Sequence, residues 1–313
     1  MKYTQLKRHD LHALLTEIEN WQYQGIPGVL KIESGQPGPT LGIMAMTHGN
    51  EPAGLAAFYA LLQDDFLQTH LTCGSVYLIL NNLAAARRYF TEAEDLSFTA
   101  HFRFVDQDMN RMPAIEAQEL TQKTYEVQRV RQLLPIYQSL DYVLDLHSTS
   151  APSEPMMIEL HPSQSTLHCP GVRILIRGIL EHLTGHALVS LCRKAQGYVI
   201  ECGSHEDPSA LMIAQNAVWR MLEFIKLLPE QPHEADPLHI YEIQKAIIFP
   251  DQSYSLTRIL HSFEFLEAGT VLARGDGEDI LVEQDAWVIM PPPRLKPVHP
   301  GSEFLYLASQ SES

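Results

Sequence analysis

Apolar runs of strand length alternate with helix-like segments over much of this chain, and this alternation limits the possible folds more than any other feature. The apolar runs cover residues 29–33, 41–46, 75–80, 141–146, 156–160 and 198–201. Segments with helical patterns lie at residues 52–63, 121–138, 171–184 and 208–228. Because strands that alternate with helices usually form a layered α/β fold, we expect a largely parallel sheet flanked by helices.

The sequence changes character after residue 228. Residues 229–237 are rich in proline and acidic residues, which is typical of a linker. Beyond them, short alternating runs separated by glycine and proline predict strands and few helices. We therefore expect an α/β domain over residues 1–228, a linker at 229–237 and a small all-β domain over 238–313.

The charge and composition of the chain exclude several kinds of partner. It has 38 Asp and Glu residues against 22 Lys and Arg residues, a net charge of −16. This charge repels nucleic acid and anionic lipid, so we expect neither as a partner. No apolar run approaches the ~18 residues of a membrane helix, and the first residues, MKYTQLKRHDLHALL, lack the features of a signal peptide. The four cysteines form no CxxC pair, so we expect reduced thiols and a cytoplasmic location.

One expected turn between a strand and a helix combines an imidazole and a carboxylate. In MTHGNEPAG, His48 and Glu51 follow an apolar run and open a helix-like segment. Open α/β folds place their sites at this carboxyl edge of the sheet. The same H-x-x-E spacing occurs twice more, at His239/Glu242 and His261/Glu264. Because these two pairs lie in the expected β domain, away from any strand-to-helix turn, we interpret them as surface or core polar residues.

Two further apolar runs end in side chains that could join this pair. DYVLDLHSTS places His147 at the end of one run, and YVIECGSHED places Glu201 at the end of another. Two neutral imidazoles and one carboxylate are a ligand set of hydrolytic zinc, and a further carboxylate can supply a general base. Taken singly, His147 could be a satisfied core histidine and Glu201 a surface acid near a helix. Because all these residues are expected at one edge of the sheet, we favour a hydrolytic zinc site.

The segment HFRFVDQDMNRMP, residues 101–113, has no clear helical or strand period. Arg103 and Arg111 flank an acidic stretch, and Asn110 precedes Arg111. One interpretation is a solvated loop with salt bridges. The other is a carboxylate-binding loop, because guanidinium groups offer paired donors and Asn110 adds an amide donor.

Four motifs, THGNEPAG, RFVDQDMNR, DLHSTS and VIECG, resemble in their order and spacing the succinylglutamate desuccinylase/aspartoacylase family. That family is related to the zinc carboxypeptidases of the carboxypeptidase A type. The resemblance covers residues 40–225 well and the C-terminal part more loosely. It implies a mixed, largely parallel central sheet flanked by helices, a small C-terminal all-β domain, and one zinc ion per chain.

The resemblance also implies roles for the matching residues around the metal. It makes His48, Glu51 and His147 the zinc ligands. Glu201 would be the catalytic base. Asp108 matches a carboxylate that orients a liganding histidine.

Other matching residues concern the substrate. The resemblance implies that Arg103 polarises the scissile carbonyl and stabilises its oxyanion. It implies that Asn110 and Arg111 bind a substrate carboxylate. Arg193, in LCRKAQ, lies near the place of another carboxylate-binding arginine of the family.

These implications lead to three functional hypotheses. The first is a zinc amidohydrolase that cleaves a small N-acyl amino acid, such as an N-succinyl or N-acetyl acidic amino acid. The second is a zinc carboxypeptidase that acts on short peptides. The third is a catalytically inactive zinc-dependent binding protein, against which Glu201 argues because a binding site needs no acid beside the metal. The sequence leaves open the acyl group, the amino acid and whether the chain forms a homo-oligomer.

Overall fold

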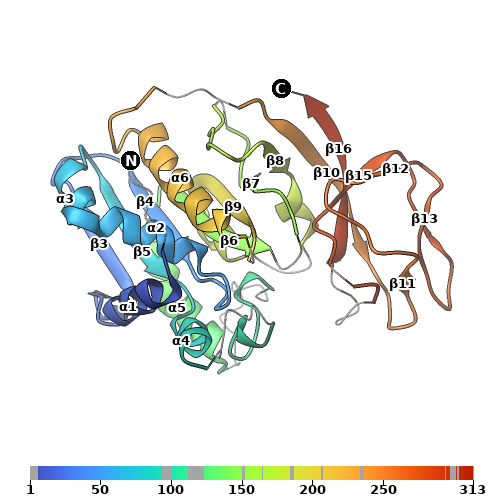
Figure 1. Ribbon diagram of the computed structural model, residues 1–313, viewed down its shortest axis with the longest axis horizontal. Helices are drawn as coiled ribbons and strands as arrows, with labels where there is room; N and C mark the ends of the chain where they lie inside the picture. The colour runs from blue at the N-terminus through green and yellow to red at the C-terminus, as the bar shows by residue number, and fades with distance from the viewer. Residues whose placement is uncertain are drawn as a thin grey trace.

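The computed structural model describes residues 6–92, 100–111, 123–149, 152–163, 165–183, 187–205, 207–232, 236–292, 294–296, 301 and 303–312. In this part of the chain, a core of strands and helices is followed by a C-terminal region of strands (Figure 1). Within these residues, no helix is both long and apolar enough to cross a membrane.

One mixed sheet of the described residues has the strand order β12-β15-β16-β10-β8-β7-β9-β6-β4-β5-β3. Its strands are β3 (Val29–Glu33), β4 (Thr40–Ala45), β5 (Ser75–Leu80), β6 (Tyr142–Thr149), β7 (Met156–Glu159), β8 (Ile174–Arg177), β9 (Gln196–Ser204), β10 (His239–Ile248), β12 (Phe265–Leu266), β15 (Ala286–Ile289) and β16 (Glu303–Glu312). The central strands β5, β4, β6 and β9 run parallel to one another. The strands β3 and β7 run antiparallel to their neighbours β5 and β9. The predicted mixed α/β sheet with a parallel centre is therefore confirmed.

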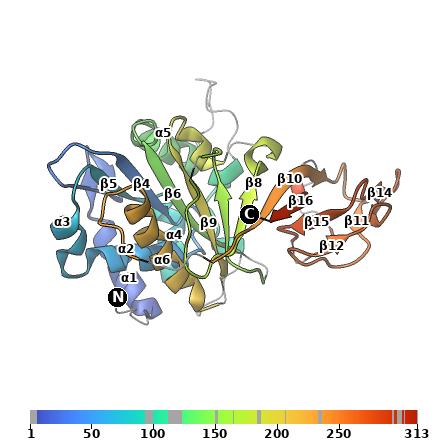
Figure 2. The same ribbon diagram turned by 90° about the horizontal axis from the view of Figure 1, so that it is seen from above.

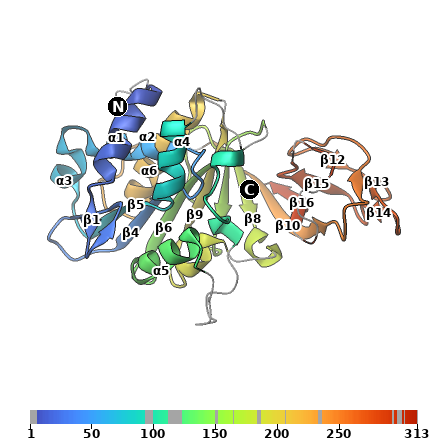
Figure 3. The ribbon, with the colours of Figure 1, turned by 90° about the horizontal axis from the view of Figure 1, so that it is seen from below.

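Helices cover both faces of this sheet. They are α1 (Arg8–Ile18), α2 (Ala53–Leu62), α3 (Phe66–His70), α4 (Leu83–Glu92), α5 (Tyr125–Tyr137) and α6 (Ser209–Phe224). The helices α2 and α6 pack together over one face, where Ile43 of β4 joins their apolar core (Figure 2). Helix α5 lies over the other face, where Met44 joins a second core (Figure 3). Because successive side chains of a strand point to opposite faces, β4 contributes to both cores.

Residues 171–184 do not form the predicted helix. Strand β8 and a 3₁₀ turn, Ile179–His182, occupy this segment, and residue 184 lies outside the described residues. Gly178, with φ of 78°, separates the strand from the turn in a conformation that favours glycine. The prediction was wrong because a short apolar run does not show by its period whether it is a strand or a buried helix.

The C-terminal strands continue the central sheet. Strand β10 pairs in parallel with β8 and antiparallel with β16, and β15 and β12 follow beyond β16. Smaller sheets are formed by β11 (Ser255–Leu256), β13 (Val271–Arg274) and β14 (Ile280–Leu281), and by β1 (Gln22–Tyr23) and β2 (Ile26–Pro27). Residues 233–235 of the predicted linker lie outside the described residues, and the division into two domains stays a prediction.

Candidate metal and active site

Strand β4 ends in a tight turn that carries His48 and Glu51 into α2. Between them, Gly49 lies so close to another loop that a Cβ at this position would be 2.4 Å from the Phe102 carbonyl oxygen. The Gly49 N–H also donates to the Arg103 carbonyl oxygen at 2.8 Å. This turn therefore requires glycine, and the close approach holds the Arg103 segment against it.

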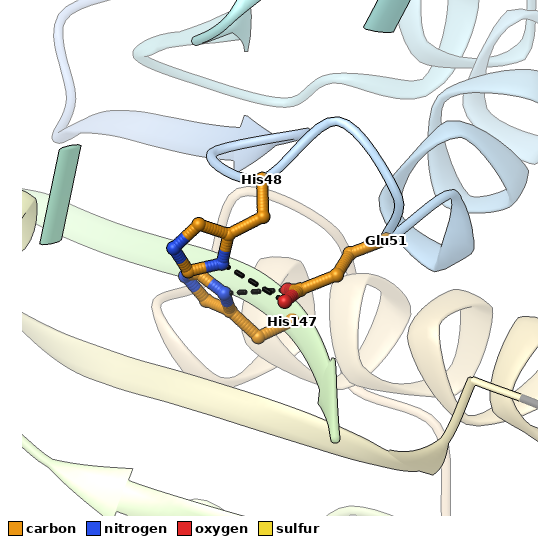
Figure 4. Close-up of side chains that lie close together, drawn as sticks. All are labelled: His48, Glu51 and His147. Atoms are coloured by element: carbon orange, nitrogen blue, oxygen red, sulfur yellow. Dashed lines mark hydrogen bonds and ion pairs between the residues drawn. The ribbon is translucent and has the colours of Figure 1, made fainter. Parts of the chain in front are cut away.

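His147, on β6, meets this turn at the carboxyl edge of the parallel strands (Figure 4). The Glu51 carboxylate faces both imidazoles, with Oε2 2.8 Å from His147 Nδ1 and Oε1 2.9 Å from His48 Nδ1. Each of the three side chains is only 2% exposed. Their donor atoms lie within 4.8 Å of one another, so in the described part of the chain these side chains form a group that could hold a metal ion.

A second carboxylate supports each imidazole on the side away from Glu51. His48 Nε2 lies 2.9 Å from Asp108 Oδ1, and His147 Nε2 lies 3.0 Å from Asp145 Oδ2. Metal-binding histidines usually have such a partner, because it sets the tautomer and the orientation of the ring. Both Nδ1 atoms are thereby directed toward the same carboxylate.

The electrostatics of this cluster favour a cation between its side chains. Among the described residues, His48 Nδ1 has no partner with hydrogen-bond geometry, although a Glu51 oxygen lies 2.9 Å away. Burial lowers the pKa of His147, but Asp145 and Glu51 outweigh it and raise that pKa well above its ordinary value. Burial raises the pKa of Glu51, but the two histidines hold it well below its ordinary value. Nitrogen donors beside carboxylates that stabilise positive charge fit a divalent ion such as zinc.

Glu201 lies beside His147 on the neighbouring strand β9, where the two residues are register partners. Its side chain is buried, and within the described part of the chain its Oε2 has no hydrogen-bond partner. Burial raises the pKa of Glu201 to about 7, against the opposing effect of His147. A carboxylate with this pKa can take up and release a proton near neutral pH, as a general base requires.

The loop that contains Arg103, Asp108 and Asn110 also reaches the cluster. Arg103 donates from Nη1 to Glu51 Oε1 at 2.9 Å and from Nε to Asp108 Oδ2 at 3.2 Å. Asn110 Nδ2 lies 3.4 Å from His147 Nε2. These contacts make the loop a wall of the site.

Arg111 extends from the same loop toward the C-terminal strand β16. Its Nε lies 2.8 Å from Glu303 Oε1, and its Nη1 donates to the Asn110 carbonyl oxygen at 2.8 Å. On the same strand, burial raises the pKa of Tyr306, while the charge of Arg111 lowers it. The C-terminal strand thus places polar side chains beside Arg111, which the sequence did not predict.

Arg193 is exposed in the turn that precedes β9, whereas Glu201 lies in the second half of that strand. The 3₁₀ turn Leu188–Leu191 lies just before Arg193, and its Leu188 N–H donates to Asn110 Oδ1 at 2.9 Å. The role of Arg193 in substrate binding stays a prediction.

The other two H-x-x-E pairs lie apart from the cluster. His239 is exposed on β10, and His261 is exposed in a loop where Glu264 pairs with Arg258. Neither pair belongs to a metal-capable group of the described residues.

Two buried polar residues near the cluster were not predicted from the sequence. Asp145 and His147 alternate along β6, so their side chains share a face, and this D-x-H spacing could have identified Asp145. His205 follows β9, and its Nδ1 lies 2.7 Å from Ser148 Oγ. No periodic pattern points to His205, because only the pairing of β6 with β9 brings it there.

Replacing Asp145 or Asp108 by Asn should weaken zinc binding about 10–100-fold, because each carboxylate orients one imidazole. Competition with a chromogenic chelator would measure the affinity. A matched control is Asp141→Asn, since Asp141 accepts from the Thr40 N–H at the opposite end of β6. Equal zinc affinities in all three variants would show that these carboxylates do not support the metal site.

The fold and the cluster together define an α/β protein with a buried group of two histidines and a glutamate at the carboxyl edge of its sheet. Residues 37–175, which include every residue of that group, match the model of the succinylglutamate desuccinylase/aspartoacylase catalytic domain. In this segment, the chain is similar to the succinylglutamate desuccinylase/aspartoacylase family. The names of this family denote deacylases. A comparison with curated protein sequences found no significant match.

The similarity to solved structures extends beyond that segment. The succinylglutamate desuccinylase from Chromobacterium violaceum has a TM-score of 0.64 at 17% identity, over 96% of this chain and 97% of that chain. A succinylglutamate desuccinylase from Vibrio parahaemolyticus has a TM-score of 0.66 at 15% identity, over 90% and 86%. Murine aminoacylase 3 has a TM-score of 0.56 at 20% identity, over 90% and 98%. At these identities, the likeness shows a shared fold that includes the C-terminal strands.

Proposed function

We propose that this protein is a zinc-dependent deacylase that hydrolyses the amide bond of a small N-acyl amino acid, such as an N-succinyl or N-acetyl acidic amino acid. The observation that carries this proposal is the buried His48–Glu51–His147 group with Glu201 beside it on the next strand. Two imidazoles and a carboxylate are a ligand set of hydrolytic zinc enzymes. The match of residues 37–175 to the catalytic-domain model of a deacylase family supports the same reaction class.

His48, Glu51 and His147 would hold one zinc ion per chain. When bound, zinc would polarise the scissile carbonyl and lower the pKa of a water molecule. Glu201 would accept a proton from the attacking water and return it to the leaving nitrogen. Its buried position, with one oxygen that has no hydrogen-bond partner among the described residues, suits this exchange.

Arg103 and the residues after Asp108 would act on the substrate. Arg103, fixed by Glu51 and Asp108, would donate to the carbonyl oxygen as it becomes negatively charged. Asn110 and Arg111 would bind a carboxylate of the substrate. Such local positive charge is needed in a chain with a net charge of −16, which otherwise repels an anion.

The two arginines should affect different kinetic constants. Arg111→Ala should raise KM for an acidic N-acyl amino acid about 10-fold or more, because one charge-assisted pair is lost. Arg103→Ala should lower kcat about 10²-fold, because its donor acts on the developing oxyanion. Steady-state kinetics would separate these effects, with exposed Arg258→Ala as the control. Equal changes in KM with unchanged kcat in both variants would contradict both roles.

A panel of substrates tests the proposed reaction. Zinc-loaded protein would be assayed for release of free amine from N-succinylglutamate, N-acetylaspartate, other N-acyl amino acids and short peptides. We expect hydrolysis of at least one N-acyl amino acid and slower or no cleavage of peptides. Cleavage of peptides alone would support a carboxypeptidase, and zinc-dependent binding without hydrolysis would support a binding protein.

A further inference from the structure

Glu126, in the first turn of α5, is a buried carboxylate outside the metal-capable group. Its exposure is 0%, so its charge has no access to water. A carboxylate in this position is costly unless hydrogen bonds compensate for the lost hydration. In the described part of the chain, every donor that reaches it is a neutral N–H group.

Consecutive backbone N–H groups of one loop converge on this carboxylate. Val105 N donates to Oε1 at 2.7 Å, and Asp106 N and Gln107 N donate to Oε2 at 3.1 Å and 3.3 Å. Such a run of N–H groups forms a concave site for an anion. The carboxylate of Glu126 fills that site and thereby sets the path of residues 105–107.

Further hydrogen bonds tie this loop and Glu126 to their surroundings. The Asp106 carboxylate accepts from the Tyr125 N–H at 2.7 Å, so the loop and the start of α5 hold each other reciprocally. The Asn82 side chain donates from Nδ2 to Glu126 Oε1 at 3.1 Å, and its backbone N–H donates to the Met46 carbonyl oxygen at 3.0 Å. Glu126 is therefore connected both to the loop and to the end of β4.

The loop that Glu126 holds is bounded by two residues of the site. Arg103 lies just before it and contacts Glu51, and Asp108 lies just after it and contacts His48. A shift of residues 105–107 would move both side chains relative to the metal-capable group. Displacements of about 1 Å in such a site can cost 10²-fold in rate.

We propose that Glu126 is a positioning residue of the deacylase site, which acts through the 105–107 backbone to hold Arg103 against Glu51 and Asp108 against His48. This inference rests on the proposed function for its kinetic consequence. The expected effects of Glu126 on zinc affinity and on the path of residues 105–107 do not depend on that function. Glu126 would thus act on the site without contacting the substrate or the metal.

The test uses Glu126→Gln, which keeps the shape but places an NH₂ group where one oxygen accepts N–H donors. We expect kcat/KM and zinc affinity to fall about 10–100-fold. The matched control is Glu159→Gln, because Glu159 is also buried and accepts from a backbone N–H, that of Ser163, in another part of the fold. Hydrogen exchange should become faster at residues 105–107 in Glu126→Gln and stay unchanged there in the control.

A double variant distinguishes positioning from a general loss of stability. If Glu126 acts through Arg103, then Glu126→Gln should cost much less in kcat when Arg103 is already Ala. The proposal would be overturned if the double variant lost kcat by the full product of the two single effects. It would also be overturned if Glu126→Gln and Glu159→Gln lost kcat/KM and zinc affinity equally. If Glu126→Gln does not fold, Asp106→Ala replaces it, because Asp106 is exposed and holds the same loop. Like Glu126→Gln, this variant should lower zinc affinity and make hydrogen exchange at residues 105–107 faster. Wild-type values for both quantities would overturn the proposal.

The outcomes also separate this inference from the proposed function. A wild-type protein that hydrolyses nothing in the substrate panel would defeat the deacylase proposal. Zinc affinity and hydrogen exchange of Glu126→Gln would still decide whether Glu126 positions the site. Active wild-type protein with an unaffected Glu126→Gln variant would defeat the inference alone.

Discussion

The Glu201→Gln variant should keep its zinc and its fold but lose kcat by about 10²–10⁴-fold, the usual effect of removing a positioned general base. Glutamine has the size of glutamate but cannot accept the proton from the attacking water. His48, Glu51 and His147 are unchanged, so the metal site should survive. KM should change little, because Asn110 and Arg111 remain in place.

Zinc content, melting temperature and kinetics measured on one preparation would decide this prediction. Glu159→Gln provides a matched loss of a buried carboxylate outside the site. Turnover at a nearly wild-type rate in Glu201→Gln would mean that another group accepts the proton. Loss of zinc from the variant would mean that Glu201 is a ligand and that the role of Glu51 needs revision.

Removal of either imidazole should abolish stable zinc binding. His48→Ala and His147→Ala each leave two of the three side chains that converge in this cluster, and hydrolytic zinc sites use three protein ligands. Zinc per chain, measured by elemental analysis after dialysis, should fall from about one to near zero. Activity should fall with it.

The exposed histidines of the other H-x-x-E pairs supply the controls. His239→Ala and His261→Ala should keep the zinc content of the wild type, since neither residue belongs to a metal-capable group of the described residues. A metal that survives both substitutions in the cluster and leaves with one of the controls would place the site elsewhere.

Periodicity predicted the central sheet well, because strands such as β4, β5 and β6 are buried on both faces. The runs at 29–33 and 75–80 coincide with β3 and β5. The segment at 171–184 failed, since a short apolar run such as ILIR fits a strand or a buried helix equally well. The helices α1 and α4 were not predicted, although α4 directly follows the buried strand β5.

The convergence of His48, Glu51 and His147 could be anticipated because parallel strands bring their carboxyl ends to one edge. The supporting residues could not be inferred in the same way. Glu126 reaches the site only through the backbone of another loop, and Glu303 only through the pairing of β16 with β10. Such contacts depend on tertiary structure and leave no local pattern in the sequence.

The most direct test of the proposed function is a zinc titration of the metal-free protein during hydrolysis of the best N-acyl amino acid in the panel. Chelator-treated protein should be inactive, and activity should rise with added zinc and reach its maximum at about one ion per chain, as a single three-ligand site requires. Full activity of the metal-free protein, or no activity at any zinc concentration despite one bound ion, would contradict a zinc-dependent deacylase.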